Sequence, residues 1–253
     1  MGFSTFKAEM ASGTRMVGTF QRIPRHETTE VLAHAGLDFV CLDTEHSPYS
    51  RSELDMCLAT ARALDFPALV RVAAGNPEYI LQALDSGAVG VVVPHIYSVD
   101  KARAVAQAAH FGKGGRGFAG ATRWAGLGRQ TFPEILAQSA AQTVVLAQIE
   151  EPEGVEAAQE IAGTDGIDGL FIGPADLSIA YGQPNLSSPE LNDAFGKVGA
   201  ACRATGKPLV TFVGNAQKAR DWKDHGISVF FVGSDVNFIA AAAKAECGAI
   251  RDI

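Results

Sequence analysis

Short apolar runs rich in Val, Ile and Phe recur along the chain, and longer stretches with apolar residues at helical spacing separate them. Runs that are apolar at nearly every position are typical of strands buried on both faces. The pattern predicts strands at Met16–Phe20, Phe39–Asp43, Ala68–Val72, Val89–Val93, Val144–Ile149, Gly169–Ile172, Leu209–Val213 and Val229–Val232.

The amphipathic stretches between these runs predict helices, most clearly at Ser52–Leu64, Pro77–Ser86, Val99–His110 and Glu153–Ala162. One of them begins with a typical helix start, Asn76-Pro77, and stops at Gly87. Parallel strands joined by helices in eight such units predict one (β/α)8 TIM barrel, an α/β fold, over residues 1–253. A doubly wound open sheet is the alternative fold that this pattern leaves open.

One connection is longer than the rest. Between Val93 and Val144 lie a helix and then a glycine- and arginine-rich loop at about 111–132, which contains GKGGRGFAGATRWAGLGR. Long connections in compact domains are usually functional or disordered, and we interpret this one as a lid. It is not a P-loop, because Gly114 follows Lys113 where that motif has Ser or Thr.

Composition narrows the classes of function. The chain has 253 residues, 47% hydrophobic, which is enough for a sizeable core. A net charge of −7 without a Lys/Arg-rich block argues against a nucleic-acid partner, and no apolar segment approaches the ~20 residues that span a membrane. The N-terminus lacks the apolar core of a signal peptide. Widely spaced cysteines without a CxxC pair are typical of reduced thiols, so we expect a cytoplasmic protein.

Polar side chains stand where four of the predicted strands end, and catalytic residues of barrels lie at the C-terminal ends of strands. Each residue alone has a structural explanation, as an ion-pair partner, a helix cap or a loop residue. Their convergence on one rim favours a shared site. The residues are Asp43, Glu45 and His46 after strand two, Arg71 on strand three, Gln148 and Glu150 at strand five, and Asp176 after strand six.

These residue types indicate proton transfer beside a carbonyl. Glu150 and Asp176 form an oxygen-only site of the kind that Mg²⁺ or Mn²⁺ prefers. Arg71 offers a planar donor pair for a carboxylate, and His46 beside Asp43 resembles an acid-oriented general base. Together they predict enolate formation from a 2-oxo acid whose carbonyl the metal polarises. A Schiff-base mechanism is disfavoured, because no lysine lies at the C-terminal end of a predicted strand.

The segments DFVCLDTEHSP, ALVRV, LDSGAVGVVVP, LAQIE and GLFIGPADLSIAYG resemble the HpcH/HpaI aldolase/citrate lyase family, most closely its class II pyruvate aldolases. The resemblance runs over nearly the whole chain. It implies a TIM barrel of the phosphoenolpyruvate/pyruvate type that forms a homo-oligomer, usually a hexamer with the last helix exchanged. It also implies carbon–carbon lyase activity, in which an aldehyde and pyruvate or a related 2-oxo acid form or come from a 4-hydroxy-2-oxo acid.

The same resemblance implies roles for individual residues. A divalent ion (Mg²⁺, Mn²⁺ or Co²⁺) would bind Glu150 and Asp176. His46, oriented by Asp43, would be the base acting through a metal-bound water, and Asp85 would lie near the metal waters of an adjacent subunit. Pyruvate would be held by Arg71, Gln148 and the backbone of Gly173, Pro174 and Ala175.

Two positions depart from the family pattern where the aldehyde should bind. His95 stands where an apolar residue is expected, and either contacts a polar aldehyde or packs. The loop lacks the usual proline before Arg116. Two other functions stay open: a citrate-lyase-type CoA-ester lyase, and a phosphate-binding barrel isomerase with glycines after strands seven and eight. The helix expected at 237–253 has a modest apolar face, which predicts packing against another subunit.

Overall fold

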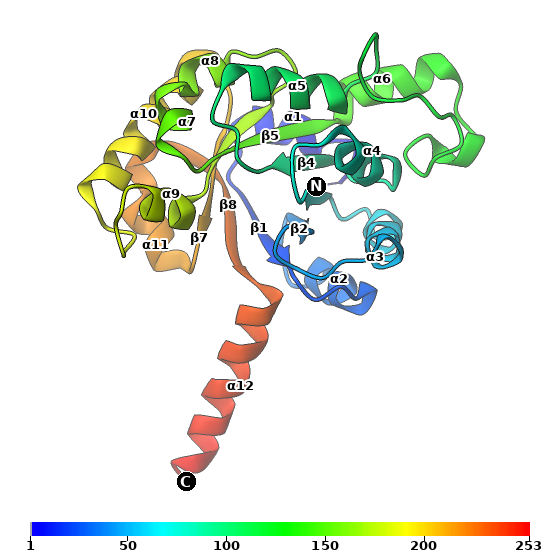
Figure 1. Cartoon of the computed structure of the whole chain (residues 1–253). Helices are drawn as coiled ribbons and strands as arrows, with labels where there is room; N and C mark the ends of the chain where they lie inside the picture. The colour runs from blue at the N-terminus through cyan, green and yellow to red at the C-terminus, as the bar shows by residue number, and fades with distance from the viewer. Residues whose placement is uncertain (1) are drawn as a thin grey trace.

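Eight parallel strands close into a barrel in the computed structural model, which describes residues 2–253 (Figure 1). Each strand pairs with its neighbours in sequence, and the first pairs with the last. This order confirms the predicted (β/α)8 TIM barrel and excludes the open sheet. The strands are β1 (Met16–Gln21), β2 (Phe39–Asp43), β3 (Ala68–Arg71), β4 (Gly90–Val93), β5 (Val144–Ile149), β6 (Gly169–Ile172), β7 (Leu209–Val213) and β8 (Ile227–Ser234).

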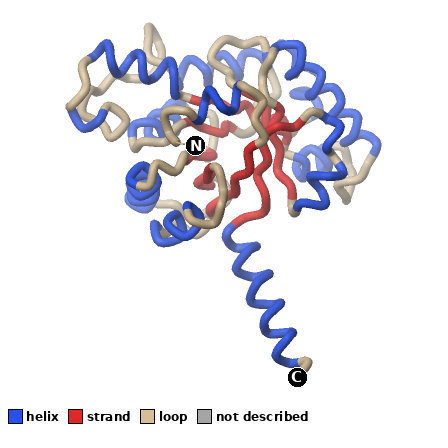
Figure 2. The backbone as a smooth tube through the Cα atoms, turned by 180° about the vertical axis from the view of Figure 1, so that it is seen from behind, coloured by secondary structure: helices blue, strands red, loops and turns tan. Residues whose placement is uncertain are grey.

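Helices surround the strands, except for the last helix, which extends away from the barrel (Figure 2). They are α1 (Phe6–Ala11), α2 (His26–Ala33), α3 (Arg51–Ala63), α4 (Pro77–Asp85), α5 (Val99–Ala109), α6 (Phe132–Gln142), α7 (Pro152–Glu156), α8 (Ala158–Ala162), α9 (Pro174–Ala180), α10 (Pro189–Thr205), α11 (Ala216–Asp221) and α12 (Asp235–Arg251). A capping box between Ser50 and Glu53 starts α3. The single helix predicted at Glu153–Ala162 is two helices that meet at Ala157.

Aromatic side chains fill the interior of the barrel. The ring of Phe231 lies 5.1 Å from that of Phe20 and 4.9 Å from those of Phe39 and Phe171, measured between centroids. Inward-facing positions of neighbouring strands meet at the barrel axis, where bulky apolar residues pack into a solid core. Phe20 and Phe171 also line the cavity at the C-terminal end of the strands, so this core forms the floor of the candidate site.

The loop at 111–132 does not cover the site of its own chain, and the prediction of a lid is wrong in that respect. It follows α5, which returns the chain to the N-terminal ends of the strands, and it leads into α6, which precedes β5. Arg116 pairs there with Asp85 at the end of α4, and Arg123 donates to the carbonyl oxygen of Ser86 at 3.0 Å. A loop between a helix and the next strand of a barrel lies at the end opposite the catalytic face.

The last helix, α12, leaves the barrel and extends away from the other helices (Figures 1 and 2). Asp235, at its first position, is its one buried residue. The Asp235 carboxylate accepts hydrogen bonds from the backbone N–H groups of Arg22 at 2.9 and 3.1 Å and of Ile23 at 2.9 Å. The start of α12 is therefore held against the end of β1, whereas the rest of the helix exposes Phe238, Ile239 and Ile250.

Candidate active site

A cavity of about 330 Å³ opens at the C-terminal ends of the strands. Most of the residues predicted from the sequence line it. The complete lining is Phe20, Arg22, Asp43, His46, Arg71, Gln148, Phe171, Gly173, Pro174, Ala175, Asp176, Phe212, Gly233, Ser234 and Asn237. Because these residues come from β1, β2, β3, β5, β6, β7 and β8 and the segments that follow them, the cavity lies across the axis of the barrel.

Asp43 and Arg71 form a buried ion pair in this cavity. Arg71 Nε donates to Asp43 Oδ1 at 3.0 Å, and Arg71 Nη2 donates to Oδ2 at 2.8 Å. The register of the parallel strands β2 and β3 sets the two residues side by side. Burial alone would lower the pKa of Arg71, but the bond and the charge of Asp43 raise it above its ordinary value. The guanidinium therefore stays charged.

This pair changes the role that the sequence suggested for Asp43. The carboxylate was expected to orient the His46 imidazole, but within residues 2–253 it makes no hydrogen bond to that ring. It accepts instead from the backbone N–H groups of Glu45 at 3.3 Å and of His46 at 3.2 Å. A guanidinium offers two parallel donors to a carboxylate, and this bidentate geometry is stronger than one imidazole N–H. Asp43 therefore positions Arg71 and the loop that carries His46.

Asp43→Asn should lower the free energy of unfolding by about 3 kcal/mol, because it leaves the Arg71 charge without its partner in a buried position. Urea unfolding followed by circular dichroism measures the change. Asp55→Asn is the matched control, since Asp55 pairs with Arg123 at 2.8 Å but is 49% exposed. It should cost less than about 1 kcal/mol. Equal losses in the two variants would show that the Asp43–Arg71 pair contributes no more than a surface contact.

His46 lies at the mouth of the cavity with 56% of its side chain exposed. Its backbone is held at both ends, because its N–H donates to Asp43 and its carbonyl oxygen accepts from Arg22 Nη2 at 3.0 Å. The carboxylate closest to the imidazole is that of Glu45, 3.8 Å from Nε2. Burial raises the pKa of Glu45, while the charge of Arg71 opposes this shift. Glu45 is thus the acidic neighbour of the imidazole.

Glu150 is a buried acid at the end of β5, with 3% of its side chain exposed. Its Oε2 accepts from Gln148 Nε2, and its Oε1 accepts from the His95 backbone N–H at 2.8 Å. Burial raises the pKa of Glu150, and the charge of Asp176 acts in the same direction. Asp176 stands in the first turn of α9 and lines the cavity.

The oxygen atoms around Glu150 are suitable ligands for a divalent cation. Two carboxylates supply hard oxygen ligands, and a cation beside them would remove the cost of keeping both charged. Gln148 adds a buried Oε1 that has no hydrogen-bond partner among residues 2–253. A Cβ atom at Gly173 would lie 2.9 Å from Glu150 Oε2, so a larger residue there would require the carboxylate to shift.

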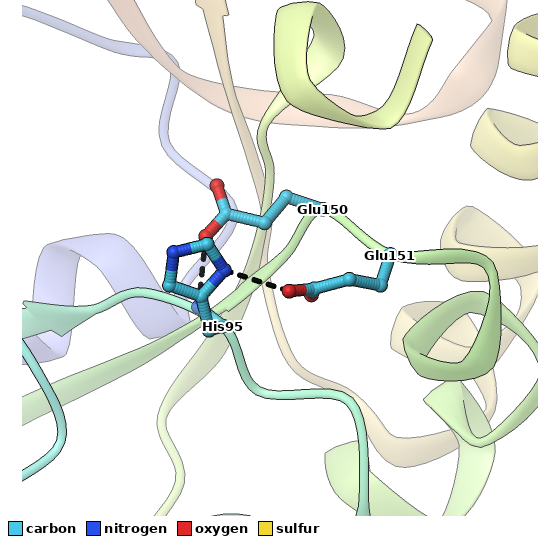
Figure 3. Close-up of side chains that lie close together, drawn as sticks. All are labelled: His95, Glu150 and Glu151. Carbon is cyan, nitrogen blue, oxygen red and sulfur yellow. Dashed lines mark hydrogen bonds and ion pairs between the residues drawn. The ribbon is translucent and has the colours of Figure 1, made fainter. Parts of the chain in front are cut away.

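His95 and Glu151 extend this acidic group (Figure 3). His95 Nδ1 lies 2.6 Å from Glu151 Oε1 and 3.1 Å from Glu150 Oε1, and the three donor atoms lie within 4.8 Å of one another. Burial alone would lower the pKa of His95, but the bond to Glu151 and the charge of Glu150 raise it. Glu151 is a residue of the site that the sequence pattern did not predict. The order of the strands could have indicated this contact, because β4 and β5 are neighbours and the residues that follow them lie close together.

Asp85 does not join the cavity of its own chain. It ends α4 on the opposite side of the barrel, where its carboxylate pairs with Arg116. The resemblance placed Asp85 at the site of an adjacent subunit, and that placement stays a prediction.

The fold and the cavity define a TIM-barrel enzyme whose catalytic face carries the buried Glu150, the exposed Asp176 and an arginine clamp. Residues 17–242 match the family model described as HpcH/HpaI aldolase/citrate lyase. The chain belongs to this family of class II aldolases, and it is an enzyme of the carbon–carbon lyase class. No helix within residues 2–253 has the length and apolar character needed to cross a membrane.

Named relatives agree with this assignment. The chain is 32% identical over 246 residues to a hydroxypyruvate/pyruvate aldolase of Roseovarius nubinhibens, covering 95% of this chain and 94% of the relative. It is 32% identical over 248 residues to a 5-keto-4-deoxy-D-glucarate aldolase of Citrobacter koseri, covering 97% and 96%. A crystal structure of a family member from Burkholderia cenocepacia superposes with a TM-score of 0.92 at 30% identity, covering 98% of this chain and 99% of that one.

Proposed function

We propose that this protein is a metal-dependent aldolase that joins pyruvate, or a related 2-oxo acid, to an aldehyde and cleaves the resulting 4-hydroxy-2-oxo acid. The observation that carries this proposal is that Asp176, Arg71 and His46 line one cavity. Glu150 lies next to it, bound to the lining residue Gln148. The names of the two relatives support a 2-oxo acid substrate.

The proposed metal is Mg²⁺, Mn²⁺ or Co²⁺, held by Glu150 and Asp176. When bound, it would supply a positive charge that polarises the 2-oxo group. Arg71 binds the carboxylate of the 2-oxo acid through Nη1, since Nε and Nη2 are committed to Asp43. Gln148 and the backbone at Gly173, Pro174 and Ala175 line the space for the rest of the acid.

His46 is the proposed base. Removal of a proton from C3 of the 2-oxo acid makes the enolate, and the same imidazole handles the hydroxyl proton when the aldol is cleaved. Its exposed position at the cavity mouth suits exchange of that proton with solvent. Three cysteines are buried and free, and Cys247 is exposed and free, which supports a reducing, cytoplasmic location.

The experiment that tests this function is a panel of 4-hydroxy-2-oxo acids assayed for pyruvate release. The protein is first stripped of metal with a chelator, then supplied with Mg²⁺, Mn²⁺ or Co²⁺. We expect no release from the stripped protein and release after addition of at least one ion. Full activity after rigorous metal removal would contradict the proposal.

We also propose a homohexamer in which α12 packs on a neighbouring subunit. Ile250→Asp should then reduce the mass measured by light scattering, because burying a charge in an apolar contact costs several kcal/mol. Ile250 is 67% exposed in the single chain. Val31→Asp is the control, since Val31 is 69% exposed on α2 and should leave the mass unchanged. A wild-type protein that is a stable, active monomer would rule out the hexamer.

A further inference from the structure

The candidate cavity has a second polar end that the proposed chemistry does not use. In the closed strand order, β5 and β6 lie across the barrel from β1 and β2. Glu150 and Asp176 belong to the first side. On the opposite side, Arg22 follows β1 and Asn237 lies in the first turn of α12, and both line the cavity. The floor of the cavity between the two ends is aromatic, with Phe20, Phe171 and Phe212 as lining residues.

Arg22 is held in place without being neutralised by a close partner. Its Nη2 donates to the His46 carbonyl oxygen at 3.0 Å, and its Nε donates to Ser47 Oγ at 3.4 Å. Its Nη1 makes no hydrogen bond within residues 2–253. The closest carboxylate, that of Asp43, is 3.9 Å from Nε and is already bound to Arg71. The Asp235 carboxylate accepts hydrogen bonds only from backbone N–H groups in this region, including that of Arg22.

Asn237 also lines the cavity and offers it a second donor. Its side-chain Oδ1 accepts from Ser234 Oγ at 2.7 Å, which orients the amide. The Nδ2 group is then left as a donor with no hydrogen-bond partner in the described part of the chain. Two donors without acceptors at one end of a cavity form a site for an anion, because charge-assisted bonds to a guanidinium are stronger than those between neutral groups.

We propose that Arg22, assisted by Asn237, binds an anionic group at the far end of the aldehyde. This inference rests on the proposed function, which places the 2-oxo acid at Arg71 and leaves the β8–β1 side to the aldehyde. The preferred aldehydes then carry a carboxylate or a phosphate, and Arg22 is a specificity-determining residue.

The test uses aldehydes in matched pairs, with pyruvate as the common donor. Succinic semialdehyde is compared with butanal, and glyceraldehyde 3-phosphate with glyceraldehyde. The wild type should favour the charged member of at least one pair by about 10- to 100-fold in kcat/KM, mainly through the KM of the aldehyde. The pair that shows the preference identifies a carboxylate or a phosphate as the group recognised.

Arg22→Gln should bring this ratio close to one, and Arg22→Lys should leave an intermediate ratio. Arg25→Gln is the matched control, because it removes the same charge from the same loop but does not line the cavity. Thermal unfolding checks that each variant is folded. A wild type without preference in either pair would overturn the inference, as would an unchanged ratio in Arg22→Gln. Exchange of the C3 protons of pyruvate tests the proposed function separately, because no aldehyde takes part in it.

Discussion

Asp176→Asn should abolish tight binding of the divalent ion and reduce cleavage on the order of 10³-fold, because it removes one of the two proposed carboxylate ligands and the charge that balances the ion. We expect the loss of this ligand to lower the affinity for the ion, and the loss of cleavage to follow from it. Titration calorimetry with Mn²⁺ measures the affinity, and pyruvate release measures the activity.

The control for this experiment is another exposed aspartate. Asp193 lies on α10, where it pairs with Lys197 at 3.3 Å, so Asp193→Asn removes the same charge without touching the site. It should bind Mn²⁺ as the wild type does. Glu151→Gln is a further variant that tests the His95–Glu151 group, since Glu151 contacts His95 near the proposed ion. Wild-type Mn²⁺ affinity in Asp176→Asn would show that the metal is held elsewhere, and the His95–Glu151 group would become the first place to look.

The sequence predicted the barrel and the rim of the site because both depend on local patterns. A buried parallel strand is apolar at nearly every position, and the residues that follow such strands lie at one end of the barrel. All eight strands are found within two residues of their predicted ends. For the same reason, Asp43, Arg71, Gln148 and Asp176 could be assigned to one cavity before any contact was known.

Pairings within the site could not be predicted in this way. Asp43 is three residues from His46 in the chain, which suggested a contact between their side chains. The register of β2 on β3 instead aligns Asp43 with Arg71, 28 residues away. Two groups compete for one carboxylate, and the outcome depends on distances and burial that the sequence does not contain.

The position of the long loop could not be predicted for a related reason. Its length and composition indicate function, but not which end of the barrel it occupies. Counting elements would have supplied the answer, since the crossover helix α5 returns the chain to the N-terminal ends of the strands before the segment begins. At that end, Arg116 is buried against Asp85, and Trp124 is 1% exposed. Arg116 and Trp124 therefore anchor the segment at the end of the barrel opposite the cavity.

His46→Ala should slow both exchange of the C3 protons of pyruvate and cleavage of a full substrate by about 10²- to 10⁴-fold, the usual contribution of a positioned acid or base. Exchange is followed by proton NMR in D₂O with Mn²⁺ replaced by Mg²⁺, which avoids paramagnetic broadening. Metal affinity should survive, because His46 is not a proposed ligand. His34→Ala, which removes an exposed histidine at the end of α2, should leave both rates unchanged.

The two rates together separate the possible roles of this loop. Loss of both, with metal still bound, assigns the base to His46. Loss of cleavage alone would place His46 at the aldehyde hydroxyl and leave enolate formation to another group. Exchange and cleavage both at the wild-type rate would contradict a catalytic role altogether. The residues from Asp43 to His46 would then act through Arg71, whose guanidinium Asp43 holds at 3.0 and 2.8 Å, and the loop would position the clamp without moving a proton.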